Sequence, residues 1–413
     1  MQPQTLQIAT WLLYINGFFA LVELIDGGGV LHYFKERYAF GFFLGLAIVA
    51  AHVAGGFLMA NERKIGWKVS LVAAASPFVL TYVAYTQIGA SLRYRLFGGS
   101  LLSFAFDAAL LALLSLLAPV ALARPAAEQH LGATLVERGS AHYRFEHFEL
   151  ASADGQRHYR VRLGIPRRAA PASGYPVLYL LDGNAALAAL REDWLAELEE
   201  QGTPPLLVLI GPATEQRLDL DARMFDYTPA PPAGPGAADP MLGGRPSGGA
   251  AAFRALLVQR IRPEVARRVA VDEARQGLWG HSLGGLYVLD SLFSAPADFH
   301  FYIAASPSLW WQSGLLLQRH RDFPGAAARL LILRGSDERP SGAQLAADSA
   351  RSRAMAALPA DAPQRLAERL DALPGLDAEF HTFAGLGHGP MLAASLRPAL
   401  RLLAGLAPLE GRR

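Results

Sequence analysis

The first part of the chain is dominated by long runs of apolar residues that are separated by short polar connections. The runs span Ile8–Leu24, Phe40–Ala60, Val69–Ala90 and Phe97–Ala123. A helix needs about 20 mainly apolar residues to cross the hydrocarbon core of a bilayer, and each run has that length or nearly so. The first run lacks a basic start and a small-residue cleavage site, so it is not typical of a signal peptide. The pattern predicts a bundle of four transmembrane helices.

After Arg124 the pattern changes to short apolar runs that alternate with helical segments. Tyr143–Leu150 and Tyr159–Ile165 predict an antiparallel opening. Further strands are expected at Val177–Leu181, Leu206–Ile210, Gly277–Gly280, Phe301–Ala305, Leu330–Leu333 and Ala378–Phe383. Helices are expected at Ala186–Glu200, Ala252–Ala266, Leu283–Phe293, Leu345–Ala357 and Met391–Leu403. This alternation predicts an α/β fold whose mostly parallel sheet is covered on both faces by helices, and Pro229–Gly249 is expected to form a long loop.

These patterns predict a transmembrane domain over residues 1–124, a linker over 125–142 and an α/β domain over 143–413. Hydrophobic residues make up 52% of the 413 positions, and most of the excess lies in the first domain. The net charge of +2 gives no reason to expect a nucleic-acid partner, whereas a lipid bilayer is expected. The absence of cysteine excludes disulfides, thiolate metal sites and a cysteine nucleophile, and no metal or cofactor is expected.

The orientation in the membrane depends on basic residues in the loops. With four spans, both ends of the transmembrane domain lie on the same side as the middle loop. That loop holds Arg63, Lys64 and Lys68, and Arg124 follows the last span. The other loops hold Lys35, Arg37, Arg93 and Arg95, so the two orientations differ little under the positive-inside rule. We favour a bacterial inner membrane protein with its α/β domain on the cytoplasmic side, because the middle loop is the densest basic cluster.

The segment Gly280-His281-Ser282-Leu283-Gly284 matches the motif G-x-S-x-G. An expected strand precedes it and an expected helix follows it, which is the setting of a nucleophile elbow. The glycines are needed because the turn is strained and neighbouring chain segments pass close to it. The motif predicts that Ser282 is the nucleophile of a serine hydrolase.

A serine hydroxyl needs a base to take its proton. Four histidines follow Ser282, namely His300, His320, His381 and His388. Only His388 lies in a glycine-rich loop after the last expected strand and before the last expected helix. In this class of fold the chain order is serine, acid, histidine, so His388 is predicted to be the general base.

The remaining catalytic groups are predicted from strand ends. Asp337 and Glu338 both follow an expected strand and are alternatives for the acid that orients the imidazole. The backbone N–H of Leu283 is expected to stabilise the oxyanion. A second N–H is expected from the loop after the first buried strand, at Gly183 or Asn184.

Several segments together resemble the esterase-D-like α/β-hydrolases, in particular the ferric siderophore esterases that act on enterobactin, salmochelin and bacillibactin. The segments are Tyr175–Asn184, Arg223–Pro229, Gly280–Leu286, Ser306–Trp311 and Gly387–Gly389. The resemblance covers roughly residues 145–403 and implies hydrolysis of the ester bonds of a trilactone that carries catecholates. Any iron would then arrive with the substrate.

The resemblance also implies substrate-binding residues. Arg223 would face the anionic substrate, or else form an ion pair with Asp219, Asp221 or Asp226. Trp310 and Trp311 would line the cleft, or one of the two would be part of the core. The four-span domain and the turn Gly335-Ser336-Asp337-Glu338 depart from the familiar pattern, in which the acidic motif is a Gly-Glu-type turn.

The sequence therefore predicts a membrane-anchored serine esterase that cleaves siderophore esters through an acyl-enzyme. One alternative is a general carboxylesterase or acyltransferase that acts on small or lipid esters. A second alternative, of another class, is a non-catalytic membrane protein that binds or transports a ligand.

Overall fold

The computed structural model divides the chain into two compact units, Met1–Arg124 and Pro125–Arg413. The residues that it describes are 2–26, 29–60, 64–122, 131–231, 233–319, 323–338 and 349–408. Each unit has its own apolar core, so each can be understood from its own elements.

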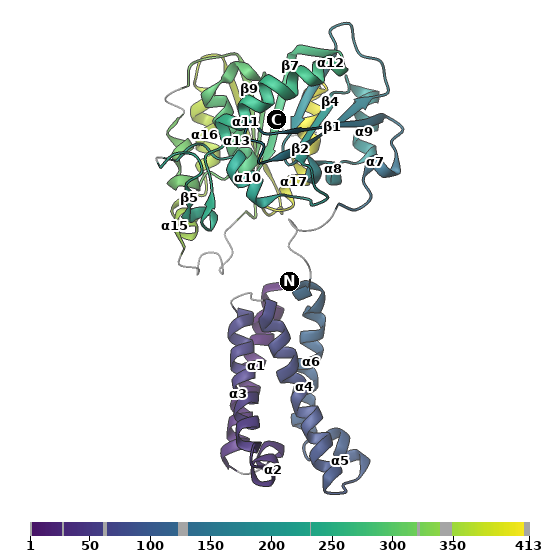
Figure 1. Ribbon diagram of the computed structural model, residues 1–413, viewed down its shortest axis with the longest axis vertical. Helices are drawn as coiled ribbons and strands as arrows, with labels where there is room; N and C mark the ends of the chain where they lie inside the picture. Colours follow the sequence, from purple (N-terminus) through teal and green to yellow (C-terminus); the bar gives the residue numbers. More distant parts are fainter. Residues whose placement is uncertain are drawn as a thin grey trace. The chain divides into compact units, whose positions relative to one another are not determined.

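The first unit is helical (Figure 1). Its long helices are α1 (Gln2–Asp26), α3 (Gly41–Ala60), α4 (Lys64–Gln87) and α6 (Leu101–Leu122), and they correspond to the four apolar runs. Helix α1 packs against α3, α3 against α4, and α4 against α6. The connections hold two short helices that the pattern did not predict, α2 (Val30–Arg37) and α5 (Leu92–Phe97).

The outer surface of this helical unit is apolar. Trp11, Phe43, Val72 and Leu102 are each more than 60% exposed. Such a surface is rare on proteins that are surrounded by water. Three helical segments among the described residues are long and apolar enough to cross a membrane: Ile8–Asp26, Gly41–Met59 and Ile65–Gln87. The described apolar part of α6, Leu101–Ser115, is shorter, and the part of the fourth predicted span that follows Ser115 has no described side chains.

The second unit is built on an eight-stranded sheet with the order β1-β2-β4-β3-β7-β8-β9-β10. The strands are β1 (Tyr143–Ala151), β2 (His158–Pro166), β3 (Tyr175–Leu180), β4 (Leu206–Pro212), β7 (Val271–His281), β8 (Phe301–Ala305), β9 (Ala328–Gly335) and β10 (Leu376–Phe383). Strand β2 is antiparallel to both β1 and β4, and the remaining pairs are parallel. The predicted α/β architecture with an antiparallel opening is confirmed.

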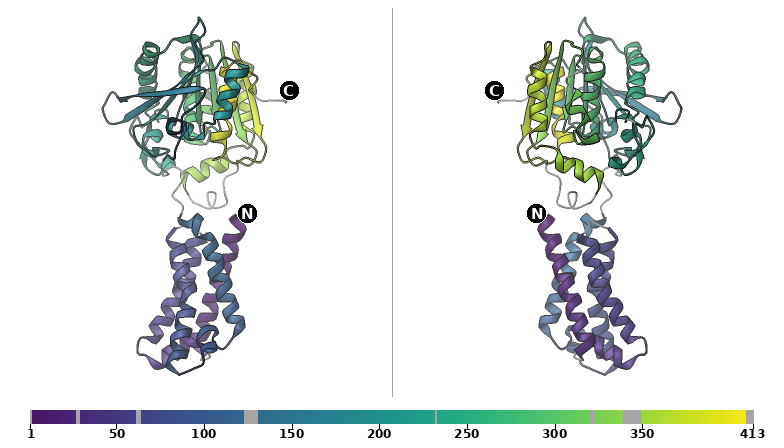
Figure 2. Two further views of the ribbon diagram at one scale, coloured as in Figure 1. Left: turned by 90° about the vertical axis from the view of Figure 1, so that its right-hand side faces the viewer. Right: turned by 90° about the vertical axis from the view of Figure 1, so that its left-hand side faces the viewer.

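Helices cover both faces of this sheet (Figure 2). They are α7 (Leu135–Arg138), α8 (Gly183–Ala189), α9 (Glu192–Gln201), α10 (Leu220–Asp226), α11 (Ala250–Leu256), α12 (Arg262–Arg268), α13 (Leu283–Ser294), α15 (Ala350–Ala357), α16 (Ala362–Asp371), α17 (Met391–Ala394) and α18 (Leu396–Leu403). Neighbouring strand residues point to opposite faces. Val177 and Tyr179 therefore pack under α11–α13 and α16, whereas Leu178 and Leu180 pack under α8, α9, α17 and α18. Burial on both faces explains why the strand runs are continuously apolar.

Three predicted segments differ in detail. The helix expected over Ala186–Glu200 is interrupted at Leu190, whose backbone is extended (φ −63°, ψ 141°), because α8 packs on β4 and α9 packs on α18. The helix expected over Leu345–Ala357 begins, within the described residues, at Ala350. The long loop Pro229–Gly249 contains a small two-stranded sheet, β5 (Ala238–Asp239) and β6 (Arg245–Pro246).

Candidate active site

The turn between β7 and α13 has the strained geometry of a nucleophile elbow. Ser282 has φ 62° and ψ −115°, a region that side-chain-bearing residues seldom occupy. A Cβ atom on Gly280 would lie 2.4 Å from the carbonyl carbon of Gly284, and one on Gly285 would lie 2.8 Å from the carbonyl oxygen of Ala305. Only glycine fits at these two positions. At Gly284, the second glycine of the motif, a Cβ would lie 3.6 Å from Asp182 Oδ2, an ordinary contact, so close approach explains Gly280 and Gly285 but not Gly284.

The loop after β10 brings an imidazole to the serine. Ser282 Oγ lies 3.0 Å from His388 Nε2 and 3.2 Å from Ser308 Oγ. On the other side of the ring, His388 Nδ1 lies 3.1 Å from Glu338 Oε2. The side chain of His388 is 49% exposed and that of Glu338 is 9% exposed. A hydroxyl, an imidazole and a carboxylate in this order can move a proton away from the hydroxyl and stabilise the resulting imidazolium.

The two acidic candidates take up different positions. Glu338 Oε1 accepts hydrogen bonds from Ser306 Oγ at 2.5 Å and from the Gly335 N–H at 2.7 Å. Burial raises the pKa of Glu338, but the hydrogen bonds from His388, Ser306 and Gly335 outweigh burial and hold that pKa below its ordinary value. Asp337 is exposed and accepts a hydrogen bond from Ser336 Oγ at 2.8 Å instead. The structure thus places Glu338, and not Asp337, against His388.

His281 is a further residue of the site that sequence reasoning did not single out, although it lies inside the serine motif. Its Nε2 lies 2.9 Å from the carbonyl oxygen of His388, and the two rings are 4.8 Å apart. Burial and, to a smaller extent, the neighbouring titratable imidazole of His388 lower the pKa of His281 well below its ordinary value. A neutral His281 with its proton on Nε2 donates to that carbonyl and supports the loop that carries His388.

The expected oxyanion donors lie at two helix N-termini, where the first N–H groups have no partner inside the helix. Leu283 begins α13 and Gly183 begins α8. A Cβ on Gly183 would lie 2.6 Å from the backbone N of Ile210, so α8 starts in direct contact with β4. The Asn184 side chain donates from Nδ2 to the carbonyl of Gln216 at 2.8 Å and so joins α8 to the loop after β4. Stabilisation of an oxyanion by these amides stays a prediction.

Arg223 is not a free cation. Its guanidinium makes two hydrogen bonds to the carboxylate of Asp182, at 3.0 and 2.9 Å, and both side chains are at most 10% exposed. The partner is therefore Asp182 and none of the three aspartates near Arg223 in the sequence. Arg223 also approaches the carbonyl of His281 at 3.4 Å, so this ion pair connects the loop after β3 with the serine turn.

The two tryptophans differ in environment. Trp311 is completely buried, and its Nε1 donates to Asp239 Oδ2 at 2.9 Å, so it is a core residue that anchors the long loop. Trp310 is 8% exposed, and the guanidinium of Arg351 lies 4.7 Å above its ring. Both tryptophans belong to the buried core, and a contact of Trp310 with substrate stays a prediction.

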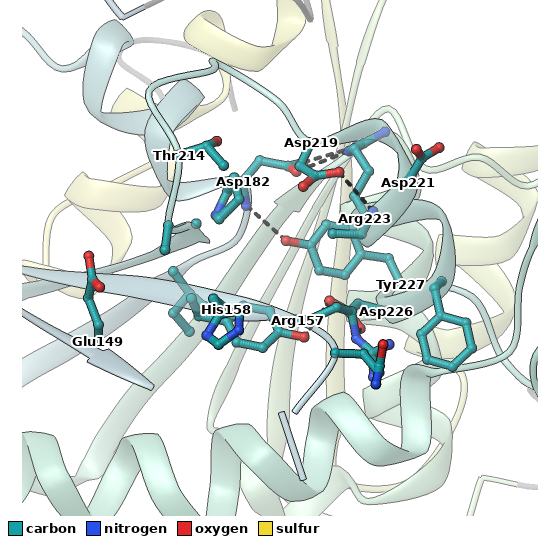
Figure 3. A pocket seen from close by; sticks show the side chains of 18 of the residues that line it. Glu149, Arg157, His158, Asp182, Thr214, Asp219, Asp221, Arg223, Asp226 and Tyr227 are labelled. Atoms are coloured by element: carbon teal, nitrogen blue, oxygen red, sulfur yellow. Dashed lines mark hydrogen bonds and ion pairs between the residues drawn. The ribbon is translucent and has the colours of Figure 1, made fainter. Parts of the chain in front are cut away.

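A cavity of about 780 Å³ lies beside the Asp182–Arg223 ion pair (Figure 3). Its wall includes Asp226 and Tyr227. The Tyr227 hydroxyl accepts a hydrogen bond from the backbone N–H of Asp182 at 3.1 Å. Burial raises the pKa of Asp226 to about 7, despite its contacts with Arg157 and the Tyr159 hydroxyl. Ser282 and His388 are not among the residues that line this cavity, so it adjoins the site without containing the reacting groups.

Comparison with known proteins places this chain among esterases. The family model for putative esterases matches residues 152–385. The apo-salmochelin esterase of Escherichia coli O6:H1 strain CFT073 is 39% identical over 280 residues, which cover 67% of this chain and 84% of that protein. The ferri-bacillibactin esterase BesA of Bacillus subtilis strain 168 is 32% identical over 265 residues, which cover 61% of this chain and 86% of that protein.

Solved structures agree with these relatives. The enterobactin and salmochelin hydrolase IroE is 38% identical and superimposes with a TM-score of 0.53 over 66% of this chain and 99% of that chain. The BES protein from Bacillus cereus is 25% identical and has a TM-score of 0.52 over 63% of this chain and 94% of that chain. The match in structure confirms the α/β-hydrolase fold of the second unit.

Proposed function

This chain belongs to the putative esterase family and is an ester hydrolase, and we propose that it cleaves the ester bonds of a ferric catecholate siderophore. The substrate class is supported by its relatives, which include esterases of salmochelin and of bacillibactin. The observation that carries the catalytic part of the proposal is the 3.0 Å approach of His388 Nε2 to Ser282 Oγ.

The proposed reaction has two steps. Ser282 Oγ attacks the ester carbonyl while His388 takes its proton, and Glu338 stabilises the imidazolium that forms. The N–H groups of Leu283 and of Gly183 or Asn184 stabilise the negative charge on the former carbonyl oxygen. His388 then protonates the leaving alcohol, and water hydrolyses the acyl-enzyme by the same path in reverse.

The proposal includes a membrane location. We assign residues 1–124 to a transmembrane domain, 125–142 to a linker and 143–413 to the esterase domain. Three apolar helices of sufficient length and an apolar outer surface support this division. We further propose a multi-pass protein of a bacterial inner membrane whose esterase domain faces the cytoplasm, where imported ferric siderophore would be opened.

Labelling with a fluorophosphonate tests the nucleophile, and substrate turnover tests the specificity. Wild-type protein should be labelled and should hydrolyse ferric enterobactin, and Ser282→Ala should lose both properties, with a rate loss of about 10⁴ or more. Equal values of kcat/KM for short p-nitrophenyl esters and for ferric enterobactin would favour a general carboxylesterase. If Ser282→Ala leaves the release of siderophore from cells unchanged, the non-catalytic alternative is favoured.

A further inference from the structure

A second serine hydroxyl lies beside the nucleophile. Ser308 Oγ is 3.2 Å from Ser282 Oγ, and Ser308 is only 2% exposed. Among the residues that the structure describes, Ser282 Oγ is the only atom with which Ser308 Oγ forms a hydrogen bond. A buried hydroxyl that bonds to nothing is costly, so Ser308 and Ser282 depend on each other for this contact.

The direction of the hydrogen bond follows from the number of protons. Ser282 has one hydroxyl proton, which must point at His388 Nε2, 3.0 Å away, if the imidazole is to act as the base. Ser282 Oγ can then offer only its lone pairs to Ser308. The Ser308 hydroxyl is therefore the donor. The hydrogen bonds run in one direction, from Ser308 to Ser282, from Ser282 to His388, and from the other ring nitrogen of His388 to Glu338.

The backbone holds Ser308 in this place without help from its hydroxyl. The N–H of Ser282 donates to the carbonyl of Ala305 at 2.9 Å, and the N–H of Ser308 donates to the carbonyl of Ser282 at 3.1 Å. Two residues before Ser308, the Ser306 hydroxyl donates to Glu338 Oε1 at 2.5 Å. The segment after β8 is thus bound to the nucleophile and to the acid, and removal of the Ser308 hydroxyl alone should leave it in place.

A donor at this position acts on the oxygen whose charge changes during the reaction. Ser282 Oγ gains negative charge as His388 takes its proton, before the bond to the carbonyl carbon is complete. The same oxygen gains negative charge again when the acyl-enzyme breaks down and Oγ is the leaving group. A hydrogen bond to a charged oxygen is stronger than one to a neutral oxygen, so the donor stabilises both transition states more than the resting enzyme.

We propose that Ser308 is a further catalytic residue, whose hydroxyl donates to Ser282 Oγ and stabilises the negative charge on this oxygen during acylation and deacylation. The proton of Ser308 stays on Ser308, whereas the proton of Ser282 goes to His388 and from there to the leaving alcohol. This inference rests on the proposed function, since it requires Ser282 to be the nucleophile. It does not depend on which ester is cleaved.

The variant Ser308→Ala tests the donor without a siderophore. In the full-length protein in detergent, kcat for p-nitrophenyl butyrate and the rate constant of fluorophosphonate labelling should each fall roughly 10- to 100-fold, the effect of losing a hydrogen bond to a charged group. KM should stay within about threefold of wild type, because acylation and deacylation slow together. Ser308→Thr keeps a hydroxyl and should recover most of the loss.

The pH dependence separates this role from a merely structural one. The pH at which kcat/KM falls to half of its maximum should be the same in Ser308→Ala as in wild type, because Ser308 bonds to the serine oxygen and not to the imidazole. A rate loss that is accompanied by a shift of this pH would show that the substitution displaced His388, and it would overturn the inference.

The matched control is Ser291→Ala. Ser291 is 1% exposed and lies on α13, about 13 Å along the helix from Ser282. This variant should keep the wild-type rates. A kcat in Ser308→Ala that is within about twofold of wild type, or above it, overturns the inference, and so does an equal loss in Ser291→Ala. If Ser282→Ala keeps hydrolysis and labelling, the proposed nucleophile is wrong. If Ser282→Ala loses both properties but Ser308→Ala loses neither, only the role of Ser308 is refuted.

Discussion

Replacement of Glu338 by glutamine tests whether this carboxylate supports the catalytic imidazole. Glutamine keeps the volume of the side chain and removes the charge that lies 3.1 Å from His388 Nδ1. The imidazole is positively charged only after it has taken the serine proton. The interaction is therefore stronger in the transition state than in the ground state, and its loss should appear in kcat.

The size of the effect follows from the distance and the exposure. Two unit charges at this distance attract by about 1 kcal/mol in water and by about 5 kcal/mol at an effective dielectric constant of about 20. The Glu338 side chain is 9% exposed but that of His388 is 49% exposed, so solvent screens part of the attraction. A middle value of about 3 kcal/mol corresponds to roughly a hundredfold loss of kcat.

The assay compares Glu338→Gln with Asp337→Asn, its neighbour in the sequence. Initial rates with a p-nitrophenyl ester and with ferric enterobactin give kcat for both variants. Asp337→Asn should stay within about threefold of wild type, because Asp337 is exposed and does not contact His388. A larger loss in Asp337→Asn than in Glu338→Gln would refute the assignment. Near-wild-type rates in both would indicate a serine–histidine dyad.

The same variant predicts a dependence of stability on pH. The folded state holds the pKa of Glu338 below 4.5, so the carboxylate stabilises the protein above that value and the contribution is lost as the pH falls through the folded pKa. The difference in free energy of unfolding between wild type and Glu338→Gln should therefore be constant near neutral pH and shrink below pH 4.5. Urea unfolding followed by tryptophan fluorescence measures it. A difference that grows in acid would contradict the lowered pKa.

Three further changes should affect folding. Gly280→Ala places a methyl group 2.4 Å from a backbone carbon and should lower the free energy of unfolding by more than about 3 kcal/mol, whereas Gly132→Ala, with open space around it, should cost under about 0.5 kcal/mol. Trp311→Phe leaves Asp239 without its indole donor and should lower the melting temperature by several degrees, at a cost of about 1–3 kcal/mol. Arg223→Met leaves a buried carboxylate unpaired and should cost about 3–5 kcal/mol in urea unfolding. Unchanged unfolding curves for any of the three would contradict the corresponding contact.

Local pattern was sufficient for the elements of the fold. The strands could be predicted because a buried parallel strand must be apolar on both faces, as Val177 to Leu180 are. The serine turn could be predicted because the close approach of its backbone requires glycine at position 280, two residues before Ser282. The interruption at Leu190 could not be predicted, because the helical pattern continues through it and only the packing of α8 and α9 against different elements breaks it.

The pairing of side chains was decided by the tertiary structure. Asp337 and Glu338 are adjacent and chemically alike, and only the path of the loop after β9 turns one towards His388 and the other to solvent. Arg223 has three aspartates close to it in the sequence, yet it pairs with Asp182, which is 41 positions away. Sequence spacing limits which residue types can do chemistry in this protein. An ion pair, however, forms only between groups that the folded backbone brings within a few ångströms of each other. That distance is set by all the strands and helices that lie between them in the chain.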